Sequence, residues 1–209
     1  MFARGTRQRD SARRILVSTE GCRTEPDYLT RFEREFLRNR VRFDCLFEKG
    51  AGSPDKVLDR MVRRMEKAAL RPGDEAWLVV DKDRWTDGQL RPLAEWAEKQ
   101  SGSIRRRLFV SNPKFELWLL LHFEDATPGM TAHAIDGRLG SLIPGYDKSI
   151  PDTILSRDSV RSAIARSEAL LRPSRFPWPE STGTTIHRGL GDLLDGIPSE
   201  GVFSGSPAT

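Results

Sequence analysis

An alternation of strand-like and helix-like segments constrains the fold of this chain more than any other feature of its sequence. The strand-like segments are RRILVS (13–18), VRFDCLF (41–47), EAWLVV (75–80) and IRRRLFVS (104–111). EAWLVV is almost wholly apolar, which is typical of a strand that helices cover on both faces. Because helix-like segments separate these strands, the sequence predicts an α/β fold with a mostly parallel central sheet flanked by helices.

The segments between the strands carry helix signals. One apolar stripe in residues 25–37 consists of Tyr28, Leu29, Phe32, Phe36 and Leu37. Ser53 and Pro54 have the chemistry of an N-cap and a first helical position. Asn112 is expected to cap a helix over NPKFELWLLLHF (112–123), and from residue 130 onward the pattern is helical and loop-rich.

This pattern divides the chain into four parts. We expect a flexible basic arm (1–12), an α/β core (13–123), a helical C-terminal extension packed on that core (124–196), and a flexible tail (197–209).

Several classes of protein are excluded by composition. The longest apolar run, FELWLLLHF, is interrupted by Glu116 and His122 and is too short to span a bilayer, so no membrane partner is expected. Cys22 and Cys45 are the only cysteines and lack metal-ligand spacing, which favours free thiols in a reducing compartment. The first residues are polar and arginine-rich rather than a signal segment, so the sequence predicts a cytoplasmic protein.

The chain carries a net charge of +4, and much of the excess lies in the arginines of its first 14 residues. Such an arm can neutralise nucleic-acid phosphates. It can equally serve as a flexible, solubilising terminus, so the charge permits a nucleic-acid partner without requiring one.

Polar residues follow the ends of three predicted strands. They are Glu20, Asp81, Asp83, Ser111 and Asn112, with Glu116 one turn into the next helix. Because ligands of open α/β sheets bind at the carboxyl ends of the strands, these groups are expected to share one edge. Converging carboxylates repel one another unless a cation neutralises them, and an all-oxygen cluster suits Mg²⁺ or Mn²⁺. Glu20, Asp81 and Asp83 are the predicted metal ligands, and Gly21 would permit close approach of a backbone or phosphate.

Each of these residues also has a structural interpretation. Thr24 with Asp27 fits a capping box. The two aspartates of DKD (81–83) can be solvated loop residues that cap the next helix, and Glu116 can lie on an exposed helix face. Ser111 and Asn112 precede a helix start, which is also a binding site for anions such as phosphate.

Five blocks of sequence resemble the RloB-like family. They are ILVSTEGCRTEPDYL (15–29), WLVVDKDRW (77–85), FVSNPKFELWLLLHF (109–123), GYDK (145–148) and STGTTIHRGLGDLL (181–194). The resemblance implies a Toprim-like fold, the catalytic core shared by topoisomerases, bacterial primases and OLD-type nucleases. Cys22 stands where a lysine or another polar residue is expected.

The resemblance also implies roles for individual residues. It assigns acid–base work to Glu20 and Mg²⁺ binding to Asp81 and Asp83, while Glu25 and Glu116 match further acidic positions. Lys148 matches a lysine that would steady a phosphate in the transition state. The family further implies an effector nuclease in anti-phage defence, held by an ATPase partner.

Two functions of different classes therefore remain. The first is a metal-dependent nuclease acting on DNA, tRNA or other RNA, and the second is a non-catalytic nucleic-acid-binding or regulatory subunit. Primer synthesis and strand passage are disfavoured, because the sequence has no zinc-ligand set and no obvious tyrosine-bearing second domain.

Overall fold

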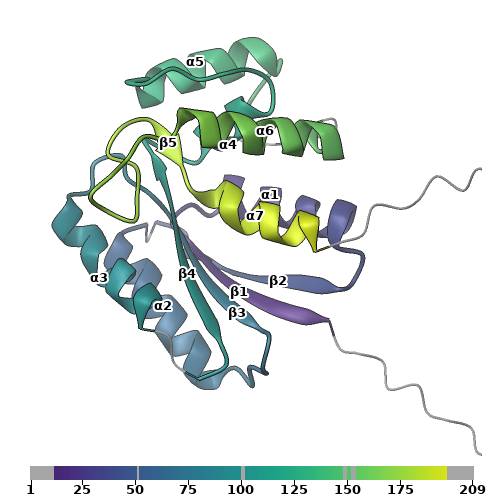
Figure 1. Ribbon diagram of the computed structural model, residues 1–209, viewed down its shortest axis with the longest axis vertical. Coiled ribbons are helices and arrows are strands. Elements are labelled where there is room, and N and C mark those ends of the chain that lie inside the picture. Colours follow the sequence, from purple (N-terminus) through teal and green to yellow (C-terminus); the bar gives the residue numbers. More distant parts are fainter. Residues whose placement is uncertain (1–11, 51, 100–101, 148–149, 152–153, 197–209) are drawn as a thin grey trace, which may run out of the picture.

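The computed structural model describes residues 12–50, 52–99, 102–147, 150–151 and 154–196. Its centre is a five-stranded sheet in the order β2-β1-β3-β4-β5 (Figure 1). The strands are β1 (Arg13–Thr19), β2 (Val41–Leu46), β3 (Glu75–Asp81), β4 (Arg105–Asn112) and β5 (Gly183–Thr184). The helices are α1 (Thr24–Phe32), the π-helix η1 (Glu33–Leu37), α2 (Pro54–Lys67), α3 (Asp87–Glu98), α4 (Glu116–Leu121), α5 (Ala132–Leu142), α6 (Arg157–Leu170) and α7 (Ile186–Asp195).

The first four strands are parallel, as the alternating sequence pattern predicts. Their carboxyl ends meet at one edge, since Thr19 pairs with Val79 and Asp81 pairs with Ser111. The predicted α/β fold with a mostly parallel sheet flanked by helices is confirmed, and its arrangement is consistent with a Rossmann-like core.

Alternating side chains of the strands build two separate cores. Ile15 and Val17 of β1 belong to a core with α1, α4, α6 and α7, whereas Leu16 packs in a second core with α2 and α3. Figure 1 shows α2 and α3 on one side of the sheet and α1 and α7 on the other. All residues of β3 from Glu75 to Val80 are buried, because helices cover both faces of this strand.

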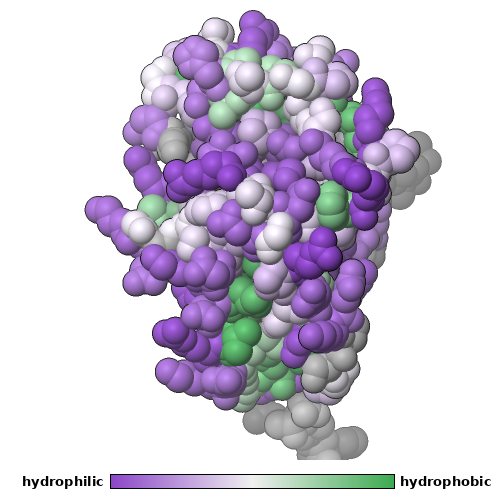
Figure 2. Space-filling view, turned by 90° about the vertical axis from the view of Figure 1, so that its left-hand side faces the viewer, coloured by the Kyte–Doolittle hydropathy of each residue, from purple (hydrophilic) through white to green (hydrophobic). Residues whose placement is uncertain are grey.

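The face of the molecule on which α3 lies is mainly hydrophilic (Figure 2). A strip of hydrophobic residues runs down its lower half. Val62 of α2 is 38% exposed. Val57 and Met61 of the same helix are fully buried. Among the described residues, no helix combines the length and the apolar character needed to cross a membrane.

The predicted stripe of residues 25–37 is confirmed, since all five of its apolar side chains are buried. The predicted capping box is wrong. Arg23 is the N-cap of α1, Thr24 is already its first residue, and the cap makes no side-chain hydrogen bond. The Thr24 hydroxyl instead donates to Glu116 Oε1 at 3.3 Å, and Asp27 pairs with Arg31.

The helix predicted to begin at Asn112 begins instead at Glu116, with Phe115 as its N-cap. Asn112 remains in β4 because β5 pairs with it, antiparallel, through Gly183. Its side-chain amide donates to the Pro179 carbonyl at 3.0 Å, so it caps no helix.

The C-terminal region adds helices and also completes the sheet. α6 packs on α4, and α7 lies against the same face as α1 (Figure 1). At Gly189 of α7, a Cβ would meet Phe109 at 2.6 Å and Trp77 at 2.9 Å, so the helix approaches the sheet unusually closely. The boundary at residue 123 stays a prediction, and the arm before residue 12 and the tail after 196 lie outside the described residues.

Candidate active site

A cavity of about 490 Å³ opens at the carboxyl ends of β1 and β3. Its lining includes six carboxylates, namely Glu20, Glu25, Glu48, Asp81, Asp83 and Glu116. Three cations, Arg23, Arg84 and Lys114, line the same space. The predicted convergence of polar groups at one sheet edge is therefore present for the carboxylates.

Glu20 follows β1 directly, and its backbone N–H donates to the Val79 carbonyl of β3. Its carboxylate accepts from Trp85 Nε1 at 2.9 Å and from the Asp81 backbone N–H at 3.2 Å. Burial raises the pKa of Glu20, although these two hydrogen bonds and the nearby Arg84 oppose the shift. The side chain is thus held in one orientation by the loop that follows β3.

Asp81 ends β3, and its Oδ1 accepts from the backbone N–H of Phe115 at 2.8 Å. Burial raises the pKa of Asp81 well above its usual value, and the charges of Glu25, Glu116 and Glu20 raise it further. Asp83 is exposed and has a φ of 23°, which aspartate tolerates better than most residues. Its backbone N–H donates to the Pro113 carbonyl, so the DKD loop is fastened to the segment that precedes α4.

Glu25 lies in the first turn of α1 and is only 4% exposed. Its Oε1 accepts from the Gly21 backbone N–H at 2.9 Å, and a Cβ at Gly21 would approach that oxygen to 2.7 Å. Burial, with the charges of Glu116 and Glu20, raises the pKa of Glu25 to about 7. The close approach predicted at Gly21 is therefore made by this carboxylate.

Glu116 is the first residue of α4 and is also buried. Its Oε2 lies 3.6 Å from Lys114 Nζ, which is also bonded to Asp136 of α5 at 2.8 Å. The hydrogen bond that Asp136 accepts, with the charges of Glu116, Asp136 and Asp81, raises the pKa of Lys114 against the opposing effect of burial. A permanent positive charge thus lies among the carboxylates.

A buried polar chain fixes α1 against α4, which carries Glu116, and against α6. The Tyr28 hydroxyl lies 3.1 Å from His122 Nε2, and His122 Nδ1 lies 3.0 Å from Ser159 Oγ of α6. Tyr28 also packs edge-on against Phe115 and Trp118. Because α1 and α4 are joined in this way, Glu25 and Glu116 face the same cavity.

The donors of the cavity fit Mg²⁺ or Mn²⁺ in their chemistry, since carboxylate oxygens suit hard cations. Burial raises the pKa values of Glu20, Glu25 and Asp81, and neighbouring carboxylates raise those of Glu25 and Asp81 further. A cation bound in the cavity would favour the charged form of each group. In the ranges that the structure describes, no group of three or more His, Cys, Asp or Glu side chains is arranged to hold a metal ion. The predicted ligands Glu20, Asp81 and Asp83 therefore line one cavity without forming a closed coordination site.

Two predicted site residues, Ser111 and Asn112, do not line the cavity. The buried hydroxyl of Ser111 lies 2.8 Å from Thr184 Oγ1, and Asn112 holds Pro179, so both side chains secure the C-terminal region. Lys148 lies outside the described residues.

Lys114 and Trp85 are part of the site but were not singled out from the sequence. Lys114 stands two residues before Glu116 in NPKFE, and a cation beside a candidate carboxylate is a signal that could have been used. Trp85 follows the DKD loop, and Arg84 lies over its ring at 4.9 Å. Its bond to Glu20 spans 65 positions in the chain, so no local pattern indicates it.

Comparison with known proteins adds one finding. The sequence model of a family described as RloB-like protein matches residues 15–193, which include every residue that lines the cavity. No curated protein and no solved structure matches the chain. Since the match covers most of the sequence, the chain belongs to the RloB-like family.

Proposed function

We propose that the cavity is the active site of a metal-dependent nuclease that cleaves phosphodiester bonds. The observation that carries this proposal is the convergence of six carboxylates and three cations on one open cavity at the carboxyl edge of a parallel sheet. Membership of the RloB-like family supports it, since the family resemblance implies a nuclease core.

In this proposal Glu20, Asp81 and Asp83 hold Mg²⁺ or Mn²⁺ in the cavity. Such an ion, when bound, activates water and stabilises the leaving oxygen in phosphodiester hydrolysis. Lys114, Arg84 and Arg23 bind phosphate oxygens of the substrate, because they are the cations that line the same cavity. Lys114 has the most fixed position of the three, since it is held by Asp136.

Two carboxylates take part in proton transfer in this scheme. Glu20 is held by Trp85 and the Asp81 backbone, which orients its oxygens toward the cavity that it lines. Glu25, with a pKa raised by burial to about 7, exchanges a proton close to neutral pH. Glu116 acts through Lys114, whose position and charge it helps to maintain.

The experiment is a cleavage assay on labelled DNA, total RNA and tRNA with Mg²⁺ or Mn²⁺. Glu20→Gln and Asp81→Asn should each abolish cleavage while leaving the melting temperature within a few degrees of the wild type. Glu66→Gln, on an exposed position of α2, is the matched control and should cut normally. Wild-type activity in the Glu20 and Asp81 variants would place the reaction elsewhere.

We also propose that the nuclease is an effector of anti-phage defence that works with an ATPase partner. The support is the family membership alone. Co-expression with an ATPase encoded beside the gene should yield a complex whose cleavage depends on that partner. If neither the chain nor the complex cuts any substrate but the chain binds nucleic acid, the function is that of a non-catalytic subunit.

A further inference from the structure

A groove rich in arginine runs along the outer edge of β4 and shares no lining residue with the carboxylate cavity. It consists of two adjoining cavities of about 370 Å³ and 210 Å³, which share Pro177 and Arg188. Five arginines line it: Arg105, Arg106, Arg107, Arg172 and Arg188. Among the described residues that line these two cavities, Glu98 alone is acidic.

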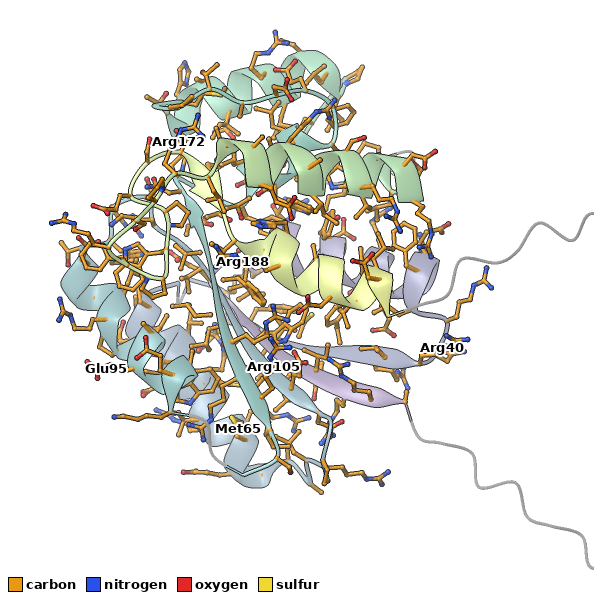
Figure 3. The ribbon with its side chains drawn as sticks, in the orientation of Figure 1. Arg40, Met65, Glu95, Arg105, Arg172 and Arg188 are labelled. Atoms are coloured by element: carbon orange, nitrogen blue, oxygen red, sulfur yellow. The ribbon has the colours of Figure 1, made fainter. Side chains whose placement is uncertain are left out.

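The arginines come from three segments that are distant in the chain. Arg105, Arg106 and Arg107 begin β4, Arg172 follows α6, and Arg188 lies in the first turn of α7. Figure 3 shows Arg172, Arg188 and Arg105 one below the other along β4. The fold therefore gathers these charges into one line.

The opening of the groove results from the topology of the sheet. β3 pairs with β4 from Arg105 to Ser111, whereas β5 pairs only with Ser111 and Asn112. Most of the outer edge of β4 is thus left without a paired strand in the described part of the chain. Arg106 lies over Trp96 of α3, and Arg107 lies over Phe109 on the opposite face, so the arginines flank this edge on both sides.

Acidic partners neutralise only part of this charge. Arg107 is paired with Asp192 at 2.7 Å, and Arg105 lies 3.7 Å from the same carboxylate. Glu75 lies 4.0 Å from each of these two arginines. Arg188 is exposed, and its side chain makes no hydrogen bond or ion pair with the described residues. The groove therefore presents an excess of positive charge to solvent.

The aromatic rings beside the groove are already covered. Phe176 stacks on Trp178 with ring centroids 4.9 Å apart, and Arg175 lies over Phe176. Trp96 is covered by Arg106. Because these contacts occupy ring faces that a base would need for stacking, the groove is suited to phosphates rather than to bases.

The groove leads toward the carboxylate cavity. Trp178, which lines the smaller of the two cavities, donates to Asp87 at 3.1 Å, and Asp87 pairs with Lys82 of the DKD loop. A chain of phosphates lying in the groove would thus pass the loop that carries Asp81 and Asp83.

We propose that this arginine groove binds the phosphodiester backbone of a nucleic acid without reading its sequence. The proposal rests on the proposed nuclease function for the identity of the polyanion. It adds a second contact region, at the edge of β4, that holds the substrate outside the cavity. An acidic protein segment is the competing occupant of such an edge, and the experiment below separates the two.

The test measures binding of fluorescein-labelled 20-mers by anisotropy in EDTA, so that no metal and no cleavage are involved. Single-stranded DNA, single-stranded RNA and duplex DNA are compared over a range of salt. The variant is Arg105→Gln with Arg188→Gln, two exposed side chains whose loss should leave the fold intact. The control is Arg40→Gln with Arg63→Gln, which removes the same charge from exposed positions elsewhere. Arg172→Gln is an independent second variant of the groove.

The groove variant should bind each nucleic acid roughly tenfold more weakly and lose about 2 from the slope of log affinity against log salt. The control should stay close to the wild type, and the substrate form that loses most identifies the preferred nucleic acid. Equal weakening in the control would show that net charge alone is responsible and would overturn the proposal. Competition by polyglutamate at the same charge concentration as the oligonucleotide would overturn it as well.

The two proposals fail in different ways. Cleavage with an unchanged KM in the groove variant would reject the groove and leave the nuclease standing. Groove-dependent binding by a protein that cuts nothing would reject the nuclease and leave the groove.

Discussion

Replacing Glu25 by glutamine is expected to stabilise the protein at pH 8 although it changes a site residue. The wild-type carboxyl is 4% exposed, and burial with the charges of Glu116 and Glu20 raises its pKa from 4.5 to about 7. Because the folded state binds this proton more tightly than the unfolded state, Glu25 stabilises the fold below pH 4.5. That contribution is lost as the pH rises through 7.

The magnitude follows from the shift in pKa. A difference of 2.5 units between the folded and unfolded values, taken at 1.36 kcal/mol per unit, corresponds to about 3 kcal/mol at most. The Glu25→Gln variant would keep an oxygen for the Gly21 N–H, which the wild-type carboxylate binds at 2.9 Å, while removing the charge. For a chain of this length, the gain corresponds to a rise of roughly 6–12 °C in melting temperature at pH 8.

The assay is thermal and urea unfolding at half-unit steps from pH 4 to pH 8.5. The variant and the wild type should have similar stability near pH 4 and should diverge between pH 5 and pH 8. Glu66→Gln, an exposed change on α2, should follow the wild type within about 0.5 kcal/mol. Parallel curves for Glu25→Gln and the wild type across this range would refute the assignment of a raised pKa to Glu25.

Three further predictions concern the Glu20 carboxyl, the packing of α7 on the sheet and the metal ion. Trp85→Phe removes the donor that lies 2.9 Å from Glu20 Oε1, so the pKa of Glu20 should rise further. A ¹³C NMR titration of the Glu20 carboxyl would detect this rise as a midpoint at higher pH. Gly189→Ala places a methyl group against Phe109 and Trp77 and should lower the free energy of unfolding in urea by about 1–3 kcal/mol. The control is Gly140→Ala on α5, where no atom lies within 4 Å of the new Cβ, and it should be neutral or stabilising. Mg²⁺ at ten times its dissociation constant should stabilise the wild type by about 1.4 kcal/mol. Loss of this stabilisation in Asp81→Asn would place the ion in the cavity, whereas equal stabilisation of that variant would place the ion elsewhere.

The parallel core was predictable because its signals are local. The apolar character of residues 75–80 indicates a strand covered on both faces, and the stripe of residues 25–37 indicates one buried helix face. Since the carboxyl ends of parallel strands share an edge, the order of elements was enough to place Glu20 and Asp81 together. No side-chain contact had to be known for this step.

The contacts made by the C-terminal region were not predictable in the same way. Asn112-Pro113 has the composition of a helix start, and only the pairing of Asn112 with Gly183 shows that β4 continues through it. β5 has two residues, which is too short for any periodicity to indicate. Ser111 and Asn112 were therefore assigned to a phosphate site, whereas their side chains secure β5 and the loop before it.

The structure also decides between two interpretations of Glu25. In sequence Glu25 is equally consistent with a role in the first turn of α1 and with a role in chemistry, because acidic residues are favoured at helix N-termini. Its burial beneath Gly21 and its electrostatic repulsion with Glu116 and Asp81 depend on α1, β3 and α4 meeting at one edge. A residue that only supported the helix start would gain stability from exposure to solvent, whereas Glu25 is buried among like charges at a cost to folding. That cost is the physical reason to place Glu25 with Glu20 and Asp81 in the site.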